Sequence, residues 1–310
     1  MSRLQELLEK GEFVVTAEVG PPKGADRESV EKKCAQIAGF IDAVNVTDNQ
    51  TAIVRLSSFA SCLIAHSMGL EPVMQMTCRD RNRIALESDF LGACALGIEN
   101  FLCLTGDHQS LGNHPQAKSV FDIDSVQLLS IFRTLRDEGV FPNGEKLKGR
   151  VVAFLGAGEN PFGDPVEFRV YRLMKKIKAG AQFIQTQAVF DLEAFARFME
   201  EVCRLHLHEK VAILAGVIPL KSYQALRYMK EEVPGMVIPR EVEERMKDAQ
   251  DPKEEGIRLC VETIKALRSM RGVRGVHIMA VAWESVVPDI VREAGLFPRP
   301  GKEGERGEDS

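Results

Sequence analysis

The strongest constraint on the fold of this chain is a repeated alternation of short apolar runs with amphipathic stretches. Nearly continuous apolar runs are typical of strands that are buried on both faces. They predict strands over residues 13–19, 43–47, 72–76, 101–105, 151–155, 183–187, 212–217 and 276–281. The amphipathic stretches predict helices over residues 28–40, 53–67, 81–96, 124–136, 165–179, 192–205, 222–233 and 240–270.

Eight strand–helix units in 310 residues predict an α/β chain folded as a single (β/α)8 TIM barrel. A doubly wound sheet is the alternative. Its dinucleotide-binding form carries G-x-G-x-x-G after the first strand, whereas this chain has Glu18-Val19-Gly20-Pro21-Pro22 there. We therefore expect one barrel over residues 1–297. The charged, Gly- and Pro-rich residues 298–310 predict a disordered tail.

Composition argues against several classes of function. No run approaches the roughly 20 apolar residues of a membrane helix, and the first residues lack a signal-peptide pattern, so we expect a cytoplasmic protein. The seven cysteines include no C-x-x-C pair, which predicts reduced thiols and no metal site. The net charge of −5 without a basic cluster argues against a nucleic-acid partner.

The residues that directly follow the strands locate the candidate site, because barrel enzymes carry their active sites at the carboxyl ends of the strands. Long loops are expected after the fourth and fifth strands, at residues 106–123 and 156–164. The polar residues at the strand ends are Glu18, Thr47, Asp48, Asn49, Gln50, Thr77, Thr105, Asp107, Gln187 and Glu284.

Two carboxylates stand out among these residues. Glu18 ends an apolar strand, so we expect it to be partly desolvated and to serve as a general acid. A solvated glutamate, or one paired with Lys23, is the alternative. Asp107 follows Gly106, and a glycine lets a ligand approach the backbone closely. An aspartate that only shapes a turn is the alternative for Asp107.

Gln185 and Gln187 share one face of their predicted strand, because side chains alternate with a period of two. A buried glutamine needs partners for both its amide donor and its carbonyl acceptor. A flat heterocycle or the backbone would supply them. These residues predict a barrel mouth that binds a small ligand, but they do not define a reaction.

Short segments in order along the chain together resemble the methylenetetrahydrofolate reductase family. They lie at the ends of successive predicted strands and cover nearly the whole chain up to the tail. The segments are residues 17–22, 45–49, 75–80, 104–107, 178–181, 186–187, 190–191 and 216–219. The resemblance implies a flavin-dependent barrel enzyme that reduces 5,10-methylenetetrahydrofolate to 5-methyltetrahydrofolate.

The resemblance also implies roles for individual residues. Glu18 matches the general acid that helps to protonate N10 of the folate, so that the ring opens to a 5-iminium cation. Asp107 matches an aspartate that favours this cation and tunes the flavin. Gln187 matches a glutamine that contacts the folate, and Tyr223 falls where the family carries an aromatic residue against the substrate or the nicotinamide. Asn49 is also expected to bind the substrate.

A further set of residues matches or neighbours the family's flavin contacts. FAD is the expected cofactor, with FMN as the alternative, and NADH or NADPH is the expected electron donor.

The loops resemble those of reductases from acetogenic bacteria, some of which work with a partner subunit. A subunit that depends on a partner, and a flavin-free pterin-binding methyltransferase barrel, are the alternative functions, and we expect an oligomer. The flavin set is Thr47, Gln75, Thr105, Gly106, Asp107, Phe121, Phe154, Asn160, Arg172 and Lys176.

Overall fold

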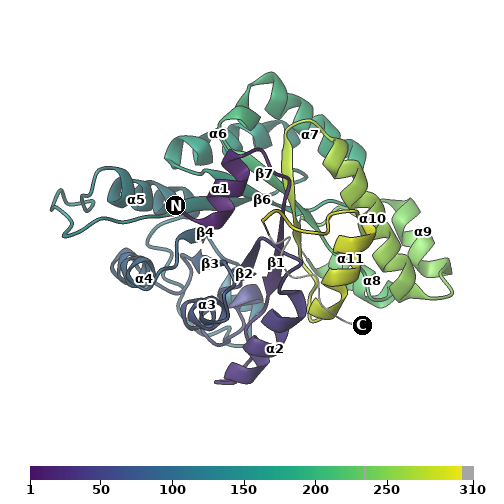
Figure 1. Ribbon diagram of the computed structural model, residues 1–310, viewed down its shortest axis with the longest axis horizontal. Coiled ribbons are helices and arrows are strands. Elements are labelled where there is room, and N and C mark those ends of the chain that lie inside the picture. The colour runs from purple at the N-terminus through teal and green to yellow at the C-terminus, as the bar shows by residue number, and fades with distance from the viewer. Residues whose placement is uncertain (234, 302–310) are drawn as a thin grey trace.

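Eight parallel strands form a closed barrel in the computed structural model, which describes residues 1–233 and 235–301 (Figure 1). Each strand pairs with the next, and β8 closes the barrel against β1. The predicted (β/α)8 barrel is therefore confirmed. The strands are β1 (Val14–Val19), β2 (Ala43–Val46), β3 (Pro72–Thr77), β4 (Asn100–Leu104), β5 (Phe154–Glu159), β6 (Phe183–Ala188), β7 (Ala212–Val217) and β8 (Val273–Ile278).

Helices surround the strands (Figure 1). Several of them begin at Asp, Asn or Ser residues whose side chains accept a backbone N–H of the first turn, as expected for N-caps. The helices are α1 (Arg3–Glu9), α2 (Arg27–Ile37), α3 (Ser58–Ser67), α4 (Arg83–Ala95), α5 (Ser125–Asp137), α6 (Arg169–Ala179), α7 (Leu192–Arg204), α8 (Tyr223–Glu232), α9 (Arg240–Asp248), α10 (Pro252–Ser269) and α11 (Val287–Glu293). Short 3-10 turns are η1 (Gln50–Ala52), η2 (Gln109–Leu111), η3 (Val166–Phe168), η4 (Leu207–Glu209) and η5 (Glu284–Val286).

Three elements differ from the sequence prediction. The helix expected over residues 240–270 is divided into α9 and α10, because Asp251 caps a new helix that has Pro252 in its first turn. The short helices α1 and α11 were not predicted. The fifth strand begins three residues later than expected and includes Gly156 and Gly158, which were expected in a loop. At Gly156 a Cβ would lie 2.2 Å from the Phe183 ring, so this strand position requires glycine.

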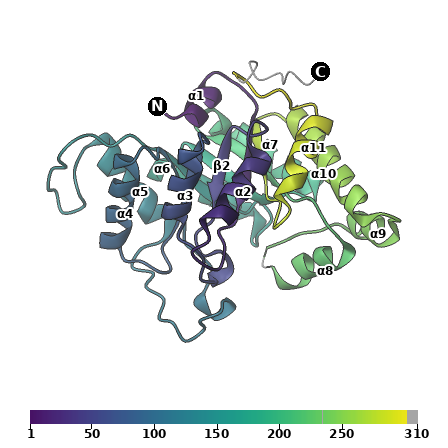
Figure 2. The same ribbon diagram turned by 60° about the horizontal axis from the view of Figure 1, so that its bottom comes forward.

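The inside of the barrel is layered from an apolar end to a polar end. α1 and the first inward residues of the strands form an apolar cluster at the amino ends. Figure 2 shows α1 far from α8, the helix that follows the carboxyl end of β7. Polar side chains occupy the next layers toward the carboxyl ends. The apolar cluster contains Leu4, Leu7, Leu8, Val14, Ala43, Val73, Leu102, Phe154, Phe183 and Leu214.

The C-terminal segment through residue 301 packs on the amino end of the barrel, which corrects the tail expected from residue 298. Arg299 is 3% exposed and forms an ion pair with Asp42 at 2.5 Å. It also donates to the carbonyls of Phe13 and Leu296. Arg299 therefore belongs to the folded barrel although it lies in a Gly- and Pro-rich stretch, because it binds Asp42 and Phe13 of the barrel. Residues 302–310 of the predicted tail lie outside the described residues.

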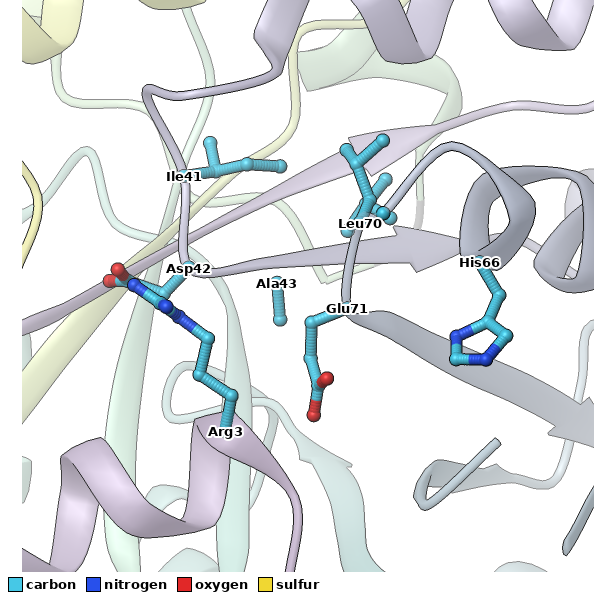
Figure 3. A pocket seen from close by; sticks show the side chains of 9 residues that line it. Arg3, Ile41, Asp42, Ala43, His66, Leu70 and Glu71 are labelled. Carbon is cyan, nitrogen blue, oxygen red and sulfur yellow. The ribbon is translucent and has the colours of Figure 1, made fainter. Parts of the chain in front are cut away.

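A small cavity lies beside this ion pair at the amino end. Its volume is about 190 Å³, and it lies between α1, β2 and the turn that precedes β3. Figure 3 shows Arg3 reaching from α1 toward Asp42, with Glu71 and His66 on the other side. This end of the barrel is opposite to the strand ends that carry the predicted site.

Candidate active site

The main cavity lies at the carboxyl ends of the strands and has a volume of about 520 Å³. This is within the range of about 300–1,000 Å³ that is usual for ligand and cofactor pockets. Most of the predicted site residues line it: Glu18, Thr47, Asn49, Gln75, Thr105, Gly106, Asp107, Asn160, Arg172, Lys176 and Gln187. The topology therefore brings together residues that are distant in the sequence.

Three predicted site residues are not among the described residues that line this cavity: Phe121, Phe154 and Tyr223. Phe154 starts β5 and packs at the opposite end of the barrel, with its ring centroid 5.1 Å from that of Phe183. β5 begins at Phe154, so this residue lies at the amino end of the strand, away from the cavity. Tyr223 donates its hydroxyl hydrogen to Glu243 at 3.1 Å and packs in a separate apolar cluster under α8.

Glu18 points into the cavity from β1, and its side chain is 18% exposed. Its titratable neighbour is His277 on β8, whose Nε2 lies 3.8 Å from Glu18 Oε2, and Lys23 forms no ion pair with it. His277 is not among the predicted site residues, because the strand there was expected to begin at residue 276. The observed β8 begins at Val273, and alternation from Gly275, which faces Val14 and Leu214, places His277 inside the barrel.

A buried hydrogen-bonded layer supports Glu18 and His277 from below. His277 Nδ1 lies 2.9 Å from Thr16 Oγ1, and Gln185 donates to the same oxygen at 3.4 Å. Gln185 and Asn45 exchange two amide hydrogen bonds of 2.6 and 3.0 Å. Side chains across the barrel thus satisfy the Gln185 amide, and neither the backbone nor a ligand is needed for it. Gln187, one layer higher, lines the cavity.

Gly106 and Asp107 lie at the rim of the cavity, after β4. Gly106 has a φ of +92°, and a Cβ there would lie 3.1 Å from Thr77 Cβ and 3.2 Å from Arg79 Cβ, so the position requires glycine. Asp107 is exposed, and its carboxylate has no ion-pair partner among residues 1–233 and 235–301. Its negative charge is therefore available to a ligand in the cavity.

The part of the cavity wall next to β5 carries positive charge from α6. Lys176 is buried and donates to Glu159 Oε2 and to the Gly158 carbonyl, each at 2.6 Å. Burial lowers the pKa of Lys176, and Glu159 opposes this shift. The ammonium group has three donors, so one remains for a ligand. Arg172 is exposed without an ion-pair partner in the described part of the chain.

These residues fit a flavin. Leu104 lies beside Gly158, which has no side chain, and Leu102 and Met279 also line the cavity, so apolar surface is present for a flat ring. Arg172 and the free donor of Lys176 suit an anionic phosphate. No group of three or more His, Cys, Asp or Glu side chains that could hold a metal ion occurs among the described residues.

The fold and the site define a barrel protein with a polar, cofactor-sized cavity at the carboxyl ends of its strands, into which the partly buried carboxylate of Glu18 points. A family model described as "Methylenetetrahydrofolate reductase" matches residues 3–295. The chain belongs to the methylenetetrahydrofolate reductase family.

Curated relatives are distant in sequence. The chain is 21% identical to a probable methylenetetrahydrofolate reductase (NADPH) of Caenorhabditis elegans, over 96% of this chain and 45% of the relative. It is 24% identical to the 5,10-methylenetetrahydrofolate reductase of Pectobacterium carotovorum, over 70% of this chain and 68% of the relative. The chain spans less than half the length of the worm and Schizosaccharomyces pombe relatives it matches.

A solved structure shares the fold over most of both chains. It is a Clostridium thermocellum protein described as binding two copies of 5-methyl-5,6,7,8-tetrahydrofolic acid. The TM-score is 0.65 at 18% identity, and the match covers 94% of this chain and 98% of that chain. At this identity the likeness shows the shared barrel fold.

No helix in the described ranges is long and apolar enough to cross a membrane.

Proposed function

We propose that this chain reduces 5,10-methylenetetrahydrofolate to 5-methyltetrahydrofolate in a flavin-dependent reaction. The observation that carries the proposal is Glu18, a partly buried carboxylate that lines the main cavity of a member of this reductase family. The likeness in fold to a protein that binds 5-methyl-5,6,7,8-tetrahydrofolic acid supports a folate as the ligand.

Glu18 acts as the general acid in this proposal. Its carboxyl group delivers a proton to N10 of the folate, so that the C–N bond breaks and the five-membered ring opens to the 5-iminium cation. A protonated His277, whose Nε2 lies 3.8 Å from Glu18 Oε2, would stabilise the carboxylate that remains after the proton has left.

Asp107 and Gln187 bind and orient the folate. The exposed carboxylate of Asp107 stabilises positive charge that develops on the substrate. Gln187 accepts the Ala188 N–H at 3.1 Å through its carbonyl oxygen, so its amide hydrogens remain for the folate. Asn49 lines the same side of the cavity as Asp107. Tyr223 contacts Glu243 instead, and its position gives no support for a folate contact.

The chemistry that a flavin held in the cavity would supply is hydride transfer to the opened folate. We propose FAD as this cofactor, with FMN as the alternative, and Thr47, Gln75, Asn160, Arg172 and Lys176 as residues that hold it. NADH or NADPH is the proposed electron donor, since relatives are named for each. The alternative source of electrons is a partner subunit that reduces the flavin. The expected oligomer stays a prediction.

Half-reactions of the purified protein test the proposed function. We expect the visible absorption band of oxidised flavin, bleaching of this band by NADH or NADPH without oxygen, and its return on addition of 5,10-methylenetetrahydrofolate. Bleaching by dithionite alone, followed by reoxidation with the folate, would indicate a partner subunit. A protein that binds 5-methyltetrahydrofolate without any flavin would contradict the proposal and favour the methyltransferase alternative.

Arg172→Gln is expected to weaken flavin binding by roughly 10- to 100-fold, because a hydrogen bond to a charged group contributes about 1.5–3 kcal/mol. Arg172 has no ion-pair partner within the described residues, so its replacement leaves no buried charge behind. Titration of the apoprotein with FAD or FMN measures the effect. Lys175→Gln is the matched control, since Lys175 is exposed on the same helix outside the cavity. Equal flavin affinity in both variants would argue against a phosphate at Arg172.

A further inference from the structure

Arg79 is a buried arginine at the edge of the main cavity, with 2% of its surface exposed. It follows β3, and its guanidinium donates to the Asn49 carbonyl at 3.1 Å and to the Asp107 carbonyl at 3.2 Å. Its positive charge is balanced by Asp80, at 2.7 and 2.8 Å. One planar group therefore connects the loops that follow β2, β3 and β4.

The backbone of Arg79 extends this connection to the far end of the β4 loop. The Val120 N–H donates to the Arg79 carbonyl at 2.8 Å. The side chain contacts Asp107 near the start of the same loop, so Arg79 holds both ends of the long insert.

The loops after β2 and β4 also pack directly on each other above Arg79. At Gly112 a Cβ would lie 1.8 Å from the Ala52 carbonyl oxygen, so the two backbones touch. The Val54 N–H donates to Asn113 Oδ1 at 3.1 Å. These two loops, residues 49–54 and 106–121, form one structural unit, which we call the rim.

The rim contains backbone that needs support. Asn49, Thr51 and Ala52 have positive φ values of 45°, 57° and 57°, a region that residues with a side chain rarely adopt. Arg79 donates to the carbonyl of the first of them. A guanidinium presents several donors in one plane, whereas a lysine ammonium is a single point, so lysine cannot make both carbonyl contacts in the same way.

We propose that Arg79 is a positioning residue that fixes the rim so that Asn49 and Asp107 face the folate. The proposal rests on the proposed function for the identity of the ligand, but the rim geometry on which it depends is independent of any ligand. Arg79 borders the cavity with only 2% of its surface exposed, and its guanidinium donates to the two carbonyl groups through which it acts.

Arg79→Lys tests the proposal, with Arg299→Lys as the matched control. Arg299 is also buried, also donates to two carbonyls and also pairs with an aspartate, but it lies at the opposite end of the barrel. We expect Arg79→Lys to weaken binding of 5-methyltetrahydrofolate at least tenfold. We expect Arg299→Lys to lower the melting temperature while leaving this affinity unchanged.

Amide hydrogen exchange without folate provides the second readout. In Arg79→Lys we expect faster exchange over residues 49–54 and 106–121, and unchanged exchange in β6 and β7. Arg299→Lys should leave the rim unchanged. Native exchange in the rim of Arg79→Lys, or an equal loss of folate affinity in both variants, would overturn the proposal. If the native protein binds no folate, the proposed function fails, and the exchange measurement alone decides the role of Arg79.

Discussion

Glu18→Gln is expected to lower the rate of 5,10-methylenetetrahydrofolate reduction by roughly 10²–10⁴-fold, the usual contribution of a general acid. The amide keeps the size of the carboxyl group and its place beside His277, but it has no acidic proton to give to N10. Flavin binding and flavin reduction by the electron donor should stay close to native, since neither requires this proton. Rapid-mixing measurements of the two half-reactions separate these effects.

Glu284→Gln is the matched control for this experiment. Glu284 is a buried carboxylate after β8, close to Lys33 at 3.3 Å, and it is not among the described residues that line the cavity. Its replacement should leave both half-reactions near their native rates. Folate reduction at the native rate by Glu18→Gln would show that another group supplies the proton.

Arg299→Met is expected to reduce the free energy of unfolding by about 3–5 kcal/mol, because it leaves the buried Asp42 carboxylate without its counter-charge. The Asp42 side chain is 0% exposed, and apart from Arg299 it accepts the Val15 N–H at 2.8 Å. The carbonyls of Phe13 and Leu296 also lose their donor. Urea denaturation at neutral pH measures the loss.

An exposed ion pair provides the comparison for this stability measurement. Arg204 and Glu201 pair at 2.7 Å on α7 with side chains that are 62% and 49% exposed. Solvent screens such pairs, so Glu201→Gln should change the unfolding curve little. An Arg299→Met variant that unfolds at the same urea concentration as the native protein would contradict the predicted role of the C-terminal segment.

The strand ends account for the part of the site that could be predicted. In a parallel barrel all carboxyl ends open on one face, so Glu18, Thr47, Thr105, Asp107 and Gln187 had to meet once the strands were located. Errors arose where a strand boundary was misplaced. β5 begins at Phe154, which therefore lies in the apolar cluster at the amino end. β8 begins at Val273, three residues before the predicted strand, so His277 was not expected at the cavity.

The sequence by itself determined the barrel, its single repeating pattern and most of the cavity residues, because these follow from local periodicity and chain order. Only the tertiary structure decided which polar residues are buried and with which partners. Arg299 and Asp42 are 257 residues apart, and Arg79 reaches loops 28 and 30 residues away. A buried charge is stable only where its partners converge, and that convergence depends on three-dimensional packing rather than on local sequence pattern.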